Sequence, residues 1–119
     1  MHGIRERGLK TKLHVVPVLK GPGYISAEIS KYVDVTDQLI VHEGYHFGGY
    51  AKTTPELLTF MKQFIARHGM LIDPVYTAKL FYAIEDLAQK DVIDKDAKVM
   101  SIHTGGLLGI WGMKEKLFG

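Results

Sequence analysis

Short β-branched runs alternate with amphipathic helical segments along this chain, and this order constrains the fold more than any other feature. The strand candidates are residues 13–19, 39–42 and 98–104, and the helical patterns cover residues 24–33, 55–69 and 74–89. Such alternation predicts an α/β fold with a mostly parallel sheet. Because an ordinary sheet has about five or six strands, three candidates predict a partial three-layer αβα arrangement around a short sheet.

Local signals predict where these elements begin and end. The first strand contains Pro17, which carries no amide hydrogen, so this strand must lie at a sheet edge or end early. Thr54 can cap a helix whose first residue is Pro55. Alternatively, Thr53 and Glu56 can form a capping box at the same place. A glycine at position 69 is expected to close this helix.

The composition is that of one small globular domain. The chain has 119 residues, of which 46% are hydrophobic and 24% are charged, values close to those of ordinary folded domains. We expect residues 1–12, which are basic and poor in apolar side chains, to be a loosely ordered N-terminal segment. Residues 13–119 are expected to form the folded part. Within it, residues 107–118 are expected to form a terminal helix that Gly109 and Gly112 interrupt.

Charge and cysteine content exclude several classes of function. The net charge is only +2 and the 15 basic residues form no stripe, so the footprint of a nucleic-acid binder is missing. The absence of cysteine excludes a disulfide framework and a thiolate metal site, and it suits a cytoplasmic protein. No apolar stretch approaches the ~18 residues of a membrane-spanning helix. The N-terminus lacks the apolar region of a secretory signal.

Thr104, Gly105 and Gly106 come directly after the third strand candidate and before a helical segment. Ligands of open α/β sheets bind beyond the carboxyl ends of strands, and paired glycines allow a cofactor or an anion to approach closely. These residues are therefore candidates to line a cofactor site. A small site for a nucleotide or an anion is an alternative use of the same residues. On geometry alone a glycine turn between strand and helix is the simpler interpretation, and no Walker pattern or complete dinucleotide fingerprint is present.

Two tyrosines stand out near predicted helix starts. Tyr76 follows Asp73 and Pro74, which are expected to cap and open the next helix. A phenol at such a place can reach a ligand, and it can act as an acid or a base if its pKa is lowered. From spacing alone a structural Tyr76 is the simpler interpretation. Tyr50 lies in an aromatic, glycine-rich loop, residues 43–52, which is as typical of packed turns as of ligand loops. The histidines do not show metal-ligand spacing.

These features occur together in a known pattern. Residues 73–79 (DPVYTAK) and residues 102–109 (IHTGGLLG), separated by a helix, resemble the C-terminal part of the 1-aminocyclopropane-1-carboxylate deaminase and D-cysteine desulfhydrase family. These are pyridoxal-phosphate-dependent enzymes of the tryptophan-synthase-β-like fold. The loop that ends in Gly49 and Tyr50, and the helix start near Pro55, fit the same family in the expected order. The resemblance covers roughly residues 13–119, and its two main motifs are specific only in combination.

The resemblance implies roles for individual side chains. It implies that Tyr76 sits at the cofactor and serves in acid–base or nucleophilic chemistry on the substrate, with Tyr50 as a second active-site tyrosine. The family's Schiff-base lysine belongs to an N-terminal part that has no counterpart here, and none of the 12 lysines lies in its context. Lys52 and Lys79 are the lysines that could be considered for this role, but Lys79 is expected to be a solvated helix residue.

The resemblance also implies cofactor contacts. It places Thr104 close to the pyridine nitrogen, where a neutral hydroxyl leaves the ring unprotonated, and it places Gly105 and Gly106 beside the cofactor. Thr77 stands where cyclopropane-opening deaminases carry a glutamate that faces this nitrogen. That departure favours the desulfhydrase-like branch and leaves the substrate in doubt.

We therefore expect the C-terminal fragment of a pyridoxal-phosphate-dependent amino-acid deaminase or desulfhydrase that has no turnover alone. Its expected partners are a small amino-acid substrate and either further copies of the chain or a missing N-terminal part. The alternative is a non-catalytic α/β module that self-associates, because a partial sheet leaves apolar surface uncovered.

Overall fold

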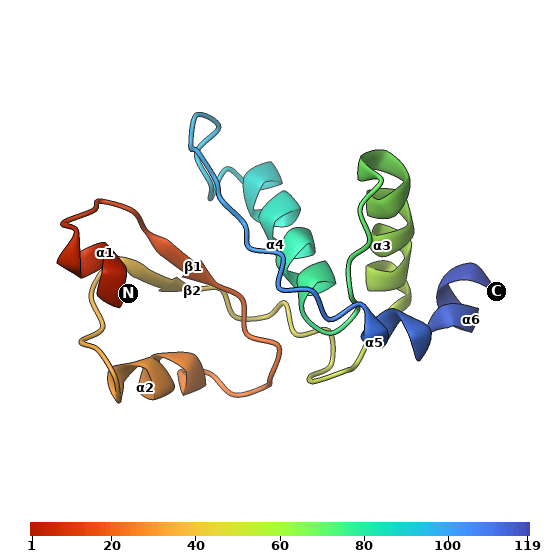
Figure 1. Cartoon of the computed structure of the whole chain (residues 1–119), viewed down its shortest axis with the longest axis horizontal. Coiled ribbons are helices and arrows are strands. Elements are labelled where there is room, and N and C mark those ends of the chain that lie inside the picture. Colours follow the sequence, from red (N-terminus) through yellow and green to blue (C-terminus); the bar gives the residue numbers. More distant parts are fainter.

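The computed structural model describes all 119 residues and has an elongated outline of 48 × 31 × 24 Å (Figure 1). The elements, in chain order, are α1 (His2–Glu6), β1 (Leu13–Val15), α2 (Tyr24–Ser30), β2 (Leu39–Val41), α3 (Pro55–His68), α4 (Thr77–Gln89), α5 (Leu108–Trp111) and α6 (Lys114–Phe118). The elements from α1 to β2 form one end of the molecule, and α3 to α6 form the other. None of these helices combines the length and the apolar character that crossing a membrane requires.

β1 and β2 form a parallel two-stranded sheet, so the predicted α/β class is confirmed. Leu13 pairs with Leu39 and Val15 with Val41, and α2 lies in the connection between the strands. β1 ends at Val15, before Pro17, as expected for a residue that cannot donate to a ladder. Residues 1–12, which were expected to be loosely ordered, contain the short helix α1, which buries no residue.

The prediction of a third strand at residues 98–104 is wrong. This segment has no regular secondary structure, and it joins the loop after α4 to α5 (Figure 1). Val99, Met100 and Ile102 are 53%, 86% and 66% exposed. A β-branched run favours an extended backbone, but a strand also requires a neighbour that exchanges hydrogen bonds with it. The sheet of β1 and β2 does not extend to this segment.

α3 begins and ends as predicted. The hydroxyl of Thr54 accepts the N–H of Leu57 at 3.2 Å, and Pro55 is the first helical residue, so Thr54 rather than Thr53 is the cap. Gly69 follows the last helical residue with a φ of 64°. This left-handed conformation costs a residue with a side chain roughly 1–2 kcal/mol, which explains the glycine.

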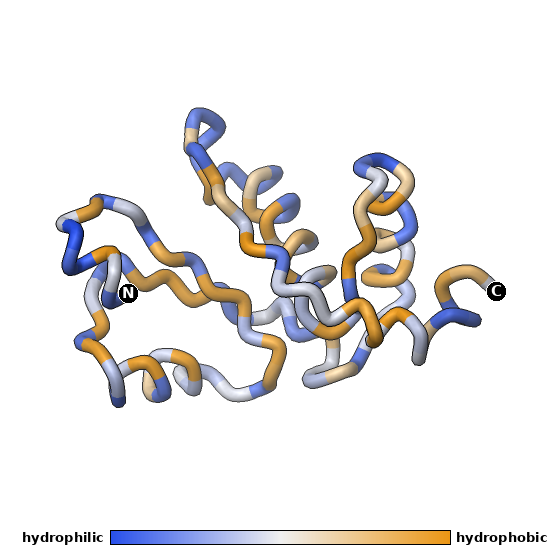
Figure 2. Tube along the Cα trace, viewed as in Figure 1, coloured by the Kyte–Doolittle hydropathy of each residue, from blue (hydrophilic) through white to orange (hydrophobic).

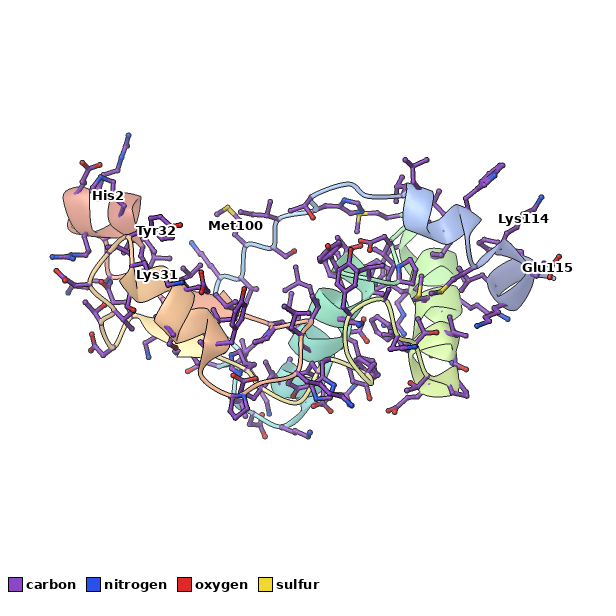
Figure 3. The ribbon with its side chains drawn as sticks, turned by 90° about the horizontal axis from the view of Figure 1, so that it is seen from below. His2, Lys31, Tyr32, Met100, Lys114 and Glu115 are labelled. Carbon is purple, nitrogen blue, oxygen red and sulfur yellow. The ribbon has the colours of Figure 1, made fainter.

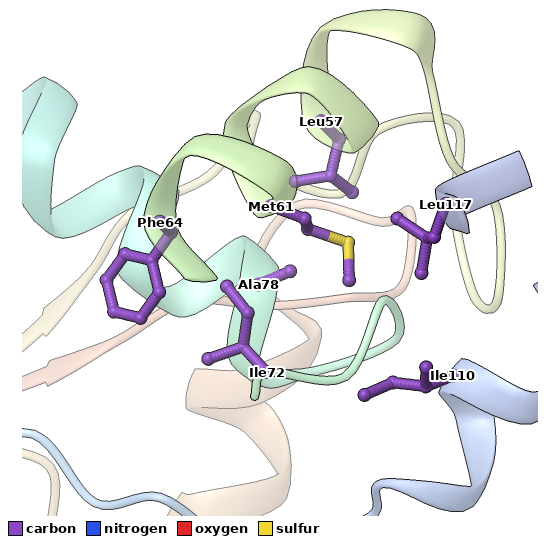
Figure 4. Close-up of a cluster of buried hydrophobic side chains, with 7 residues drawn as sticks. All are labelled: Leu57, Met61, Phe64, Ile72, Ala78, Ile110 and Leu117. Carbon is purple, nitrogen blue, oxygen red and sulfur yellow. The ribbon is translucent and has the colours of Figure 1, made fainter. Parts of the chain in front are cut away.

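The core lies between the helices (Figure 4). α3 contributes a stripe with i, i+4, i+7 spacing, and the connection to α4, α4 itself, α5 and α6 supply the rest. The buried cluster consists of Leu57, Met61, Phe64, Ile72, Ala78, Ile110 and Leu117. Burial of a large apolar side chain stabilises a fold by about 1.5–3 kcal/mol. Fourteen of the fifteen buried residues lie between Gly49 and Leu117, and the remaining one is Pro17.

Two further helices differ from the prediction. The expected terminal helix at residues 107–118 is divided into α5 and α6 at Gly112 and Met113, whereas Gly109, the other expected interruption, lies within α5. The helix predicted at residues 24–33 ends at Ser30. Residues 90–98, a charged segment that follows α4, form a hydrophilic loop that projects from the molecule (Figure 2).

Candidate active site

The turn before α4 is organised by the buried carboxylate of Asp73. Oδ1 accepts the N–H groups of Val75 and Tyr76, both at 2.8 Å, and Oδ2 accepts the N–H of Thr77 at 2.9 Å. The Thr77 hydroxyl donates to Oδ2 at 2.7 Å and accepts the N–H of Asp73 at 2.8 Å. Asp73 therefore caps the helix as predicted, but the expected start at Pro74 is wrong. The carboxylate first closes a turn, and the helix begins at Thr77.

Tyr76, the residue before α4, lies against Tyr50 of the aromatic loop. The Tyr76 hydroxyl donates to the Tyr50 hydroxyl at 3.2 Å, and the ring centroids are 6.0 Å apart in an edge-to-face arrangement. Tyr50 is 54% exposed and Tyr76 is 46% exposed. The structure thus brings together the two tyrosines that the sequence singles out, with both residues about half exposed.

Tyr76 is a neutral phenol at neutral pH. Its hydrogen bond to Tyr50, followed by partial burial and the nearby charge of Asp73, raises the pKa of Tyr76 above the ordinary value of 10.0. The sequence-based role of Tyr76 as a base depends on a lowered pKa, and this condition is not met here. The neutral phenol can instead take part in hydrogen bonds as donor or acceptor.

Lys79 holds the loop that carries Tyr50. Its Nζ donates to the carbonyl oxygens of His46 at 2.8 Å and of Gly49 at 2.9 Å, and the residue is 0% exposed. The expectation of a solvated Lys79 is therefore wrong. The side chain is buried, and its ammonium ends on the two loop carbonyls.

His103 fixes the glycine segment beside the same turn. Its Nε2 bonds to the carbonyl oxygen of Leu71 at 2.8 Å, and its Nδ1 accepts the N–H of Gly105 at 3.1 Å. These partners require the tautomer with hydrogen on Nε2. A Cβ added to Gly106 would lie 3.8 Å from the Asp73 carboxylate. The glycine segment and the tyrosine turn are therefore neighbours.

The two threonines with predicted cofactor contacts occupy different environments. Thr104 is exposed, and the structure gives its hydroxyl no partner within the chain. Thr77 is 1% exposed, and both hydrogen bonds of its hydroxyl go to Asp73. Thr104 can therefore present a free hydroxyl to a ligand, whereas the hydroxyl of Thr77 supports the turn.

Sequence reasoning missed the supporting roles of Lys79 and His103. A signal for Lys79 exists, because it precedes Ala83 by four residues and Leu87 by eight, and these three residues form one buried stripe of α4. Burial lowers the pKa of Lys79, while the charge of Asp73 opposes this effect. No local pattern links His103 to Leu71, which is 32 positions away.

A surface hollow of about 650 Å³ lies at the opposite end of the molecule, where residues of α1 meet the end of α2. His2, Lys31 and Tyr32 line it, whereas Lys114 and Glu115 mark the other end of the chain (Figure 3). Its lining is mostly charged or polar and includes none of the predicted site residues.

Comparison with known proteins gives relatives of one kind, although no family model matches the chain. A Pyrococcus horikoshii protein provisionally named 1-aminocyclopropane-1-carboxylate (ACC) deaminase is 41% identical over 73 residues, which are 61% of this chain and 22% of the relative. The bifunctional D-cysteine desulfhydrase/ACC deaminase of Arabidopsis thaliana is 32% identical over 92% of this chain and 29% of the relative. A crystal structure of an ACC deaminase homologue has a TM-score of 0.80 and 28% identity, over 97% of this chain and 37% of that one.

The Arabidopsis relative and the crystallised homologue match nearly the whole chain, the Pyrococcus relative matches 61% of it, and each match covers a minor part of the relative. The chain spans 22% to 29% of the length of the two sequence relatives. Its helices and short parallel sheet match the fold of the crystallised homologue. This chain is therefore homologous to part of the ACC deaminase and D-cysteine desulfhydrase proteins, which is consistent with the C-terminal part of that family.

Proposed function

We propose that this chain is part of a pyridoxal-phosphate-dependent enzyme that deaminates or desulfhydrates a small amino acid. The observation that carries the proposal is the contact between the hydroxyls of Tyr76 and Tyr50, which lie 26 positions apart in the chain and meet at an exposed place. The names of the relatives support the reaction class, since they include both ACC deaminases and a D-cysteine desulfhydrase.

The residues beside the tyrosine pair fit pyridoxal phosphate, which supplies an electron sink for carbanion chemistry when bound. Thr104 offers a hydroxyl without a partner in the chain, and a neutral donor of this kind suits a pyridine nitrogen. A Cβ on Gly105 would meet no atom within 4 Å, so the backbone there is open to a ligand. We assign Thr104 to the ring nitrogen, with Gly105 and Gly106 as the wall of the site.

The contact between the two hydroxyls leaves hydrogen-bonding capacity for a substrate. One hydroxyl hydrogen lies between the two oxygens, so the second hydroxyl hydrogen and the remaining lone pairs of the pair are available. The pair can thus donate to one polar group of an amino acid and accept from another. With a raised pKa, Tyr76 stays a protonated phenol at neutral pH rather than a resident base.

We further propose that the chain has no turnover alone. Lys79, one helical turn from Tyr76, is buried and its Nζ is bonded to two carbonyl oxygens, so it is not available to react with an aldehyde. The chain is mixed with pyridoxal phosphate and reduced with borohydride, and the products are located by mass spectrometry. We expect no stoichiometric adduct at any single lysine. Such an adduct at one position would contradict this part of the proposal.

The function itself is tested by complementation. The chain is co-expressed with the segment of the Arabidopsis relative that it does not match, and release of ammonia from ACC and of sulfide from D-cysteine is measured. We expect Tyr76→Phe to lower kcat about 100-fold or more and Tyr50→Phe to have a smaller effect. Tyr32→Phe, at an 87% exposed position away from the pair, is the matched control. A complex that binds pyridoxal phosphate but keeps full turnover with Tyr76→Phe would refute the assignment.

Exposed apolar side chains favour a second candidate function, that of a self-associating module. Val99, Met100, Ile102, Leu108 and Trp111 are between 53% and 89% exposed. A group of apolar side chains of this size on a small protein is typical of an association surface. Sedimentation velocity over a range of concentrations decides the point. A monomer at every concentration would contradict this candidate.

A further inference from the structure

Several residues of the aromatic loop between β2 and α3 have strained backbone conformations. Phe47 and Ala51 have φ angles of 51° and 54°, in the left-handed region that side-chain-bearing residues disfavour. Gly48 and Gly49 also have positive φ, at 99° and 121°. Residues persist in such conformations only where the surrounding structure supports them. The loop that carries Tyr50 therefore needs contacts from outside.

Lys79 of α4 provides such a contact, and one of its acceptors is the carbonyl group directly before Tyr50. Its Nζ donates to the carbonyl oxygens of His46 and Gly49, at 2.8 and 2.9 Å. The Gly49 carbonyl belongs to the peptide group that joins Gly49 to Tyr50. The same two carbonyls already accept N–H groups of the loop, His46 from Gly49 and Gly49 from Lys52, both at 3.1 Å. The ammonium thus bridges two consecutive turns of the loop.

The same helix start also sets the position of Tyr76. Tyr76 is the residue directly before α4, and Lys79 is the third residue of this helix. The Asp73 carboxylate anchors the Tyr76 backbone through an N–H bond of 2.8 Å. The start of α4 therefore fixes the position of Tyr76, and Lys79 connects the same helix to the loop that carries Tyr50.

We propose that Lys79 is the positioning residue of the tyrosine pair, because its ammonium fixes the loop carbonyls so that the Tyr50 hydroxyl meets that of Tyr76. A fully buried lysine whose Nζ bonds to carbonyl oxygens and to no carboxylate is expensive in free energy, so hydrophobic packing alone does not explain its presence. The significance of the pair rests on the proposed function, but the contact itself does not depend on a cofactor.

The test measures the contact between the two tyrosine rings by NMR in the full chain. Tyrosine rings are protonated in a deuterated background, and the Tyr50–Tyr76 cross-peak is assigned with Tyr50→Phe. We expect Lys79→Met, which keeps an apolar stem but has no donor, to lose at least half of the cross-peak intensity. Lys79→Arg, which restores donors, should recover part of it. Lys52→Met, at an exposed lysine of the same loop, should leave it unchanged.

A folded Lys79→Met variant with the full cross-peak would overturn the proposal, even if its melting temperature is lower, because a merely structural lysine affects stability and not the ring contact. If this variant does not fold, the proposal is tested by NMR on the wild-type chain instead. Its Lys79 ammonium hydrogens should exchange slowly with water and show cross-peaks to residues 46–49. Fast exchange, as in a free lysine, would overturn the proposal. Since no cofactor is present in these measurements, failure to bind pyridoxal phosphate would count against the proposed function alone.

Discussion

Single contacts set the chemistry of several tyrosines in this chain, and Tyr82 is the strongest case. Its hydroxyl, on α4, donates to the carboxylate of Glu56 at the start of α3. This bond, followed by partial burial and the charges of Glu56 and Asp86, raises the pKa of Tyr82 to about 12. The same hydroxyl therefore joins two helices and stays protonated well into the alkaline range.

The raised pKa of Tyr82 predicts a loss of stability at alkaline pH. Between the unfolded value of 10.0 and the folded value of about 12, the folded chain binds one more proton than the unfolded chain. The contribution is therefore complete below pH ~10 and disappears as the pH rises through the folded pKa. Urea unfolding across this window should show the free energies of unfolding of wild type and Tyr82→Phe converging. Tyr32→Phe is the control, and a constant gap for Tyr82→Phe would contradict the prediction.

At the scale of the elements, α3 and α4 start in different ways. Thr54 caps α3 with one hydrogen bond from its hydroxyl to Leu57. Asp73 lies four residues before the first residue of α4 and accepts three N–H groups and one hydroxyl. The start of α4 is thus a small buried network, whereas the start of α3 is a local cap.

Truncation of the two caps should therefore have unequal effects. We expect Thr54→Ala to lower the free energy of unfolding by about 1 kcal/mol. Asp73→Ala should lower it by about 3 kcal/mol, because buried donors lose a charged acceptor. Asp34→Ala, which removes an exposed ion pair with Arg5, should have an effect below about 1 kcal/mol. Equal losses for Thr54→Ala and Asp73→Ala in urea unfolding would show that the Asp73 network does not act as a unit.

Over the whole molecule, the packing is uneven. The radius of gyration is 15.3 Å, whereas a compact domain of this length has about 13.5 Å. Almost all buried residues belong to the part that contains α3 to α6, and the end that contains β1 and β2 buries only Pro17. The helical end therefore holds most of the stability that apolar burial provides.

This division predicts different local stabilities in one chain. Amides of β1, α2 and β2 should exchange with solvent faster than those of α3 and α4, because opening of the first group exposes little buried apolar surface. Hydrogen exchange followed by mass spectrometry of peptides measures both groups in the same sample. Equal protection at the two ends would show that the chain opens as one unit.

The sequence by itself determined the features that depend on neighbours within a turn or two. These are the start of α3 at Pro55, its end at Gly69 and the capping role of Asp73. Propensity and hydrogen bonding within a few residues decide such features, so they are visible in the residue pattern. The family motifs likewise single out Tyr50 and Tyr76 by their places in the sequence.

Only the tertiary structure decided what depends on distant partners. It brought the Tyr50 and Tyr76 hydroxyls together, buried Lys79 against carbonyls about 30 positions away, and left residues 98–104 without a strand to pair with. A strand needs a neighbouring backbone and a buried ammonium needs acceptors, and neither is encoded within the segment itself. The local pattern therefore predicts that a residue is available for a role, whereas packing decides whether it fills that role.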